Sequence, residues 1–326
     1  MALADGLQTR TIGSAQLQAT FVPGAAMLCC SLRHEGEELL AQRDGVRAYA
    51  ERGATMGIPL LYPWANRLAG PSYPAPDGDS VELPHSTPPL KFDANGLPLH
   101  GVLPSCLDWE LLDGDVGSET DKDGDTGGGD RADAAADAAA ELRARLRWDA
   151  RELLAIFPFA HTLELHARVA GAELAIETRV HADSAVAVPV AFGFHPYLTI
   201  PDSDRRTWEI ELPVRERLLL DAQMIPTGTS EPFARRRFVL GDGGWDDPFA
   251  GPIEPSIFSV TGAKRWIELQ FLHGFSHAQV YSPAGEDFIC FEPMTAPANA
   301  LRSGDGLRSV EPGRVFRAAF RISVSS

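Results

Sequence analysis

The chain has 326 residues and a formal net charge of −16, because 45 acidic side chains outnumber 29 basic ones. Apolar residues make up 44% of it, an ordinary globular composition that excludes a disordered, collagen-like or coiled-coil protein. The acidic balance argues against nucleic acid or a membrane surface as a partner, since phosphates would be repelled.

We expect no secretory signal in the N-terminal part. Residues 1–6 lack the basic start and apolar segment of a secretory leader, so we expect a cytoplasmic location. The uncharged stretch 11–32 is interrupted by polar residues and Pro23, which makes it unsuitable for spanning a bilayer. Residues 37–49 show a weak helical period. The four cysteines form no CxxC motif and are expected to be free thiols.

A break in composition follows at residues 113–140. This segment contains nine acidic residues, two basic ones, six glycines and seven alanines. It cannot bury enough apolar surface to offset the entropy lost on ordering. We therefore predict an acidic flexible loop that is dispensable for function.

Beyond this loop the dominant period is two. In 141–149 the apolar residues Leu142, Ala144, Leu146 and Trp148 alternate with charged ones. The same alternation recurs in 159–169, 174–180, 208–212, 267–271 and 316–324. Strict alternation is typical of half-buried strands. The sequence predicts an all-β protein with antiparallel sheets packed as a sandwich.

Four apolar segments each carry an isolated polar group. The segment 57–67 ends in Asn66 and Arg67, 97–101 contains His100, 188–197 contains His195, and 288–297 contains Glu292. If 188–195 is one strand, the small residues on the face of His195 leave room for a ligand. A histidine and a carboxylate, which titrate near ~6.5 and ~4.3, can serve as acid and base on a neutral polar ligand. Nucleotide-, zinc- and serine-nucleophile motifs are absent, so no metal or cofactor is expected.

These segments, in this order, resemble the aldose 1-epimerase (galactose mutarotase) family. The resemblance rests on Tyr62–Arg67, Leu99–Gly101, Phe194–Tyr197 and Phe291–Pro297, and on the opening and closing segments of the chain. It implies a large antiparallel β-sandwich of the galactose mutarotase-like supersandwich type, formed by one domain over residues 1–326 with 113–140 as an insertion. Motifs on both sides of the insertion must converge on one site.

The resemblance also implies roles for individual residues. Glu292 would be the general base on the anomeric hydroxyl, and His195 the general acid on the ring oxygen. Arg67, His100 and Asn66 would bind the sugar. An Asp before an aromatic residue would bind hydroxyls, and we choose Asp246 over the adjacent Asp247. The segment after Gly101 departs from many relatives, which leaves open which hydroxyl pattern is recognised.

The expected activity is interconversion of the α and β anomers of free aldohexoses such as glucose or galactose, without a cofactor. One alternative is a hexose-6-phosphate 1-epimerase, for which residues 205–206 and 235–237 could supply basic groups. The other is a sugar-binding protein of the same fold that does not catalyse. The oligomeric state cannot be read from the sequence.

Overall fold

The computed structural model describes residues 3–75, 78–112, 139–201, 203–234 and 236–326. Its largest sheet has nine strands. In spatial order they are β12 (Trp109–Leu112), β13 (Ala140–Trp148), β14 (His161–Ala170), β15 (Glu173–His181), β29 (Val315–Ser325), β25 (Trp266–His273), β24 (Ser256–Thr261), β19 (Glu209–Leu212) and β22 (Arg236–Val239). Neighbouring strands of this sheet pair antiparallel.

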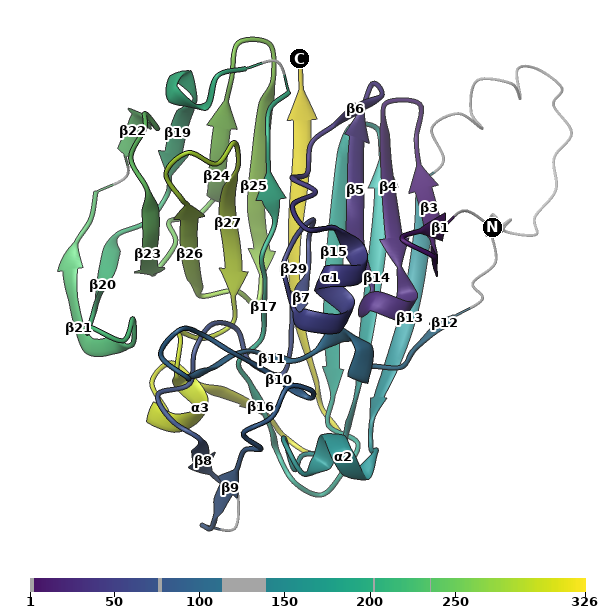
Figure 1. The fold of residues 1–326 in the computed structure, drawn as a ribbon, viewed down its shortest axis with the longest axis vertical. Helices are drawn as coiled ribbons and strands as arrows, with labels where there is room; N and C mark the ends of the chain where they lie inside the picture. The colour runs from purple at the N-terminus through teal and green to yellow at the C-terminus, as the bar shows by residue number, and fades with distance from the viewer. Residues whose placement is uncertain (1–2, 76–77, 113–138, 202, 235) are drawn as a thin grey trace, which may run out of the picture.

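An eight-stranded sheet and a four-stranded sheet lie over the nine-stranded one (Figure 1). The eight-stranded sheet comprises β21 (Pro226–Pro232), β20 (Glu216–Leu220), β23 (Trp245–Ala250), β26 (His277–Ser282), β27 (Ile289–Met294), β17 (Gly193–Phe194) and β7 (Leu60–Leu61), with β18 (Tyr197–Leu198) paired to β27. The four-stranded sheet comprises β3 (Arg10–Gly13), β4 (Leu17–Val22), β5 (Leu28–His34) and β6 (Glu37–Glu38).

Shorter elements connect these sheets. Four two-stranded sheets pair β1 (Leu3–Ala4) with β2 (Leu7–Gln8), β8 (Ser72–Pro74) with β9 (Ser80–Glu82), β10 (Leu90–Phe92) with β11 (Pro98–Val102), and β16 (Val188–Val190) with β28 (Arg308–Val310). The α-helices are α1 (Gly45–Arg52), α2 (Arg151–Leu154) and α3 (Ala300–Ser303), and single 3₁₀ turns occur at Pro23–Ala25, Pro104–Cys106 and Arg205–Thr207. Among the described residues, no helix has the length and apolar character needed to cross a membrane.

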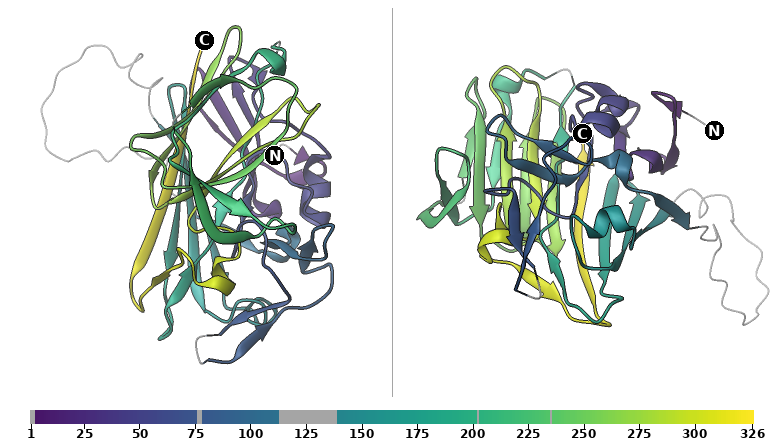
Figure 2. Two further views of the ribbon diagram at one scale, coloured as in Figure 1. Left: turned by 90° about the vertical axis from the view of Figure 1, so that its left-hand side faces the viewer. Right: turned by 60° about the horizontal axis from the view of Figure 1, so that its bottom comes forward.

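One hydrophobic core joins the layers. In β14 and β15 every second side chain is buried, as the alternation in the sequence predicts. The buried faces meet across the sandwich, where Phe320 of β29 lies 5.0 Å from Phe194 and Phe258 of β24 lies 5.6 Å from Phe291, between ring centroids. Figure 2 shows the layers from two further directions. The predicted antiparallel β-sandwich is confirmed.

Two local expectations are wrong. The segment 188–195 is not one strand: β16, β17 and β18 follow one another with breaks and pair with different partners. Residues 37–49 are helical only from Gly45. Glu37–Glu38 forms a hairpin strand with β5, and the residues between this strand and Gly45 hydrogen-bond to other parts of the chain. In both segments tertiary pairing overrides the local period.

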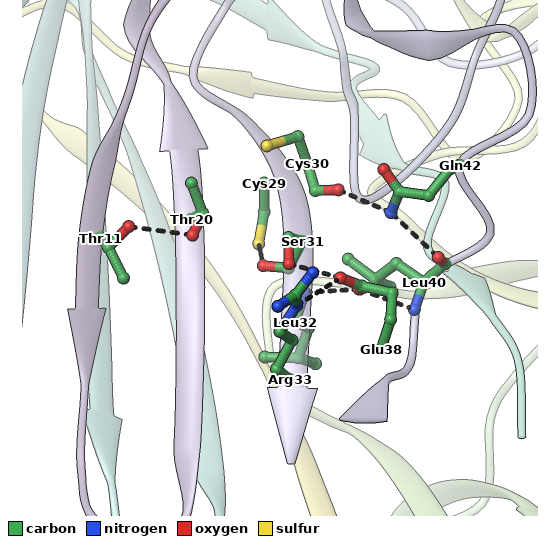
Figure 3. Close-up of polar contacts among 10 residues, drawn as sticks. All are labelled: Thr11, Thr20, Cys29, Cys30, Ser31, Leu32, Arg33, Glu38, Leu40 and Gln42. Carbon is green, nitrogen blue, oxygen red and sulfur yellow. Dashed lines mark hydrogen bonds and ion pairs between the residues drawn. The ribbon is translucent and has the colours of Figure 1, made fainter. Parts of the chain in front are cut away.

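The hairpin of β5 and β6 anchors the segment that leads to residue 43 (Figure 3). The carboxylate of Glu38 accepts hydrogen bonds from the backbone N–H of Leu32 at 2.9 Å and of Leu40 at 3.2 Å. The amide of Gln42 donates to the carbonyls of Cys30 and Leu40 at 2.9 and 3.0 Å. Buried polar groups are therefore paired where the chain leaves the sheet.

Most of the predicted loop 113–140 lies outside the described residues, which exclude 113–138. The strands on either side of it, β12 and β13, are antiparallel neighbours in which Leu112 pairs with Arg143.

Candidate active site

All six residues that the sequence predicts for the site line one cavity of about 290 Å³. They are Asn66, Arg67, His100, His195, Asp246 and Glu292. The cavity volume lies near the lower end of the ~300–1,000 Å³ usual for ligand pockets. Segments that are far apart in the chain therefore meet at one polar hollow.

Adjacent strands of the eight-stranded sheet form the floor of the cavity. Glu292 on β27 is directly opposite Gln279 on β26, and Asp246 lies on β23, the next strand along. The amide of Gln279 donates to Asp246 Oδ1 at 2.6 Å. His195 sits in the break between β17 and β18, both of which pair with β27. The broken segment thus places the imidazole beside the carboxylate.

His195 and Glu292 form a buried acid–base pair. His195 Nε2 lies 3.2 Å from Glu292 Oε1, and the two side chains are 6% and 1% exposed. Burial, with a contribution from Asp246, raises the pKa of Glu292 well above its usual value. Burial and the positive charges of Lys91 and Arg43 lower the pKa of His195 to about 3. Both shifts favour the form of the free site in which Glu292 carries the proton of the pair, within hydrogen-bond distance of the imidazole.

Tyr197 holds the imidazole in place. Its ring stacks on that of His195 with 4.4 Å between centroids and 3° between planes. Its hydroxyl lies 3.3 Å from His195 Nε2 and 2.6 Å from Thr55 Oγ1, and it accepts a hydrogen bond from Arg43 Nη1 at 3.2 Å. The ring orientation is thus fixed by stacking and by a hydroxyl that can accept or donate.

Two residues with left-handed backbone form the opposite wall. Asn66 and His100 have φ of 59° and 65°. The backbone N–H of Asn66 donates to His100 Nδ1 at 3.2 Å, and the backbone N–H of His100 donates to the Asn66 carbonyl at 2.9 Å. Burial and nearby positive charges lower the pKa of His100. Its imidazole is therefore neutral and carries its proton on Nε2.

Gly101 permits this close approach. Its φ is 74°, and a Cβ on it would lie 2.0 Å from the carbonyl oxygen of Tyr62. No residue with a side chain fits there, so the His-Gly pair of the sequence motif has a steric cause.

Arg67 is fixed by an ion pair. Its Nε lies 2.7 Å from Asp93 Oδ2, and its Nη1 donates to Asn66 Oδ1 at 3.1 Å. Although burial alone would raise it, the pKa of Asp93 is lowered by hydrogen bonds from the backbone N–H of Leu97 and from Arg67. The guanidinium is thereby held at the edge of the cavity with its charge balanced.

The structure places Asp246, and not Asp247, in the cavity. Successive residues of β23 point to opposite faces of the sheet. Asp247 accepts a hydrogen bond from Arg217 Nη1 at 3.1 Å and lines a different hollow. Burial raises the pKa of Asp246, partly offset by Gln279 and Arg67.

The expectation that small residues beside His195 leave room for a ligand is wrong at Gly193. A Cβ there would lie 2.8 Å from the carbonyl oxygen of Pro293 and 3.1 Å from the Cβ of Ala65. The absent side chain allows β17 to approach its neighbours closely. It makes no space in the cavity.

Sequence reasoning assigned no site role to several lining residues, namely Arg43, Thr55, Lys91, Tyr197, Gln279 and Tyr281. Tyr197 lies in the same motif as His195, and Gln279 is directly opposite Glu292 on the neighbouring strand. Knowledge of the strand register would therefore have identified Gln279. Arg43 lies in the turn before α1 and Lys91 lies on β10, and the local sequence marks neither as a site residue. Among the described residues, no group of three or more His, Cys, Asp or Glu is arranged to hold a metal ion.

The model of one protein family, described as aldose 1-epimerase, matches residues 10–323. The chain belongs to the aldose 1-epimerase family. The resemblance predicted from the four motifs is therefore confirmed.

Proteins similar to this chain share little of its sequence, and the solved structures among them share its fold. The uncharacterized protein YihR of Escherichia coli K12 is 22% identical over 290 residues, covering 81% of this chain and 77% of that protein. A galactose mutarotase-like protein from Clostridium acetobutylicum superposes with a TM-score of 0.76 at 13% identity, over 96% and 94% of the two chains. Galactose 1-epimerase from Lactobacillus acidophilus gives 0.72 at 12% identity, over 100% and 97%. The predicted galactose mutarotase-like fold is confirmed.

Proposed function

We propose that this protein is an aldose 1-epimerase that interconverts the α and β anomers of free aldohexoses such as glucose or galactose. The observation that carries the proposal is the buried contact of 3.2 Å between His195 and Glu292 in a polar cavity. Membership of the family supports the same reaction.

The proposed reaction needs one proton removed and one delivered. Transfer of the shared proton from Glu292 to His195 gives a carboxylate and an imidazolium. The carboxylate takes the proton of the C1 hydroxyl while the C1–O5 bond breaks, and the imidazolium gives its proton to O5. The aldehyde turns about C1–C2, and O5 attacks the other face of C1. His195 recovers its proton from O5, and Glu292 returns its proton to the C1 oxygen.

The remaining residues bind the sugar in this proposal. Arg67 and the neutral His100 present N–H donors to hydroxyl oxygens, and Asp246 presents acceptors. Asn66 holds His100 and Arg67 through the hydrogen bonds described above. Polar groups fixed in advance lower the entropy lost when the sugar is oriented.

The alternative of a sugar-binding protein without catalysis is less well supported. A binding site gains nothing from a buried carboxylate and imidazole in contact, because burial of ionisable groups is costly. Calorimetry combined with polarimetry separates the two functions. Acceleration of anomer exchange of fresh α-glucose or α-galactose supports catalysis. Saturable binding with no acceleration would establish the binding protein instead.

Of the basic residues that the sequence offered for a 6-phosphate, Arg205, Arg206 and Arg237 do not line the cavity. Arg205 is buried and donates to Ser282 Oγ at 2.8 Å, and Arg206 pairs with Asp204. Arg237 pairs with Glu209 on the nine-stranded sheet. Residue 235 lies outside the described part of the chain.

A further inference from the structure

Cationic side chains outnumber carboxyl groups in the lining of the cavity, within a chain of net charge −16. Its lining has three cations and two carboxyl groups, namely Arg43, Arg67, Lys91, Asp246 and Glu292. Arg67 is paired with Asp93 at 2.7 Å, and burial raises the pKa of Glu292, which favours its neutral form. Arg43 and Lys91 have no carboxylate within ion-pair distance in the described part of the chain.

Both cations retain free hydrogen-bond donors. Arg43 Nη1 donates to the Thr55 carbonyl and to the Tyr197 hydroxyl, both at 3.2 Å, which uses two of its five N–H groups. The guanidinium lies 5.2 Å from the ring centre of Tyr197, a contact that orients it without neutralising it. Lys91 Nζ donates to the Gly53 carbonyl at 2.8 Å and keeps two N–H groups.

Holding these cations together is unfavourable in the free protein. Burial and the charges of Arg43 and Arg67 lower the pKa of Lys91. Like charges held close in a half-buried site repel each other, and among the described residues neither Arg43 nor Lys91 has a carboxylate within ion-pair distance to relieve the repulsion. An anion bound between them would relieve it through charge-assisted hydrogen bonds.

The position of Arg43 indicates which part of the sugar would carry the anion. The Tyr197 hydroxyl lies between His195 Nε2, at 3.3 Å, and Arg43 Nη1, at 3.2 Å. In the proposed reaction His195 serves the ring oxygen, which is bonded to C5, and C5 carries the exocyclic C6. The C6 substituent is therefore the group of an aldohexose nearest to Arg43.

We propose that the site prefers aldohexoses with an anionic group on C6, either a carboxylate or a phosphate, and that Arg43 and Lys91 bind this group. The inference rests on the proposed 1-epimerase function and names acidic hexoses, rather than neutral ones, as its preferred substrates.

The test compares rates of anomer exchange, measured by NMR at low ionic strength, for glucose, glucuronate and glucose 6-phosphate. We expect kcat/KM for at least one acidic sugar to exceed that for glucose by about 10- to 100-fold, the effect of charge-assisted hydrogen bonds. The favoured anion identifies the C6 group. Lys91→Met should reduce the ratio of acidic to neutral kcat/KM by about tenfold or more. The matched control, Lys264→Met at an exposed turn, should leave this ratio unchanged.

The inference is overturned if the wild-type ratio is near or below one, or if Lys91→Met leaves it unchanged. Two substitutions of Arg43 separate the effect of its charge from that of its shape. Arg43→Lys, which keeps the charge, should retain more of the preference for acidic sugars than Arg43→Gln, which removes it. If no sugar exchanges faster than in buffer, the proposed function fails. Calorimetry then tests the inference alone: tighter binding of glucuronate than glucose, lost in Lys91→Met, supports it, and equal binding overturns it.

Discussion

Replacing Glu292 by Gln should separate catalysis from folding. The side chain is 1% exposed and its Oε1 lies 3.2 Å from His195 Nε2, so Gln fits the same space and keeps a polar contact. It removes the basicity that the proposed reaction needs. A positioned general base contributes about 10²- to 10⁴-fold, which corresponds to about 2.7–5.4 kcal/mol of barrier. We expect kcat to fall by that factor with a modest change in KM.

The same variant should not lose stability. Because the pKa of Glu292 is raised in the folded protein, folding favours the protonated form. Wild-type stability therefore declines as the pH rises from about 4.3, the usual value, through the raised pKa, by about 1.4 kcal/mol per pH unit. The Gln side chain does not ionise, so the variant does not lose stability in this way as the pH rises. The Tm of Glu292→Gln at pH 8 should be equal to or above that of wild type, and any advantage should vanish at pH 4.

Rates from polarimetry and Tm values from calorimetry, measured on the same preparations, check both statements. Retention of more than about a tenth of wild-type kcat, well short of the loss expected for a general base, would refute the assignment of Glu292. A large drop in Tm at pH 8 would refute the argument from burial.

The remaining predictions concern the rest of the site and its walls. His195→Asn should lower kcat by about 10²- to 10⁴-fold. The double variant that combines His195→Asn with Glu292→Gln should lose little more activity, since either substitution alone stalls the same proton transfer. Asp246→Asn should raise KM, whereas Asp247→Asn, on the other face of the strand, should leave KM near wild type. Gly101→Ala should unfold the protein or lower its Tm strongly, because the new Cβ would meet a carbonyl at 2.0 Å. Gly96→Ala, with φ of 75° and open space around it, should cost only about 1 kcal/mol in urea unfolding.

Local pattern was sufficient for the long strands but not for the short ones. Strands such as β14 and β15 bury alternate residues along their whole length, so their period is visible in the sequence. The segment 188–198 is buried almost throughout and is divided among three strands, because its pairing is set by distant segments. Nothing in its own sequence specifies where those partners lie.

In the site, too, local sequence predicts some residues, whereas others are recognised only from the fold. The residues predicted for it stand out as polar groups in apolar runs, and all of them line the cavity. Arg43 lies in a polar stretch of the sequence and Lys91 lies between Leu90 and Phe92, and only the fold brings them to the cavity. The choice between Asp246 and Asp247 depended on strand register, which the sequence alone left open.

The most direct test of the account is the approach of optical rotation to equilibrium after α-glucose, α-galactose, glucuronate or glucose 6-phosphate is dissolved with purified protein. We predict that the wild-type protein accelerates this approach for at least one of these sugars. We also predict that the Glu292→Gln protein, folded to the same extent, does not. Equal rates with wild-type protein and with buffer for every sugar would contradict it.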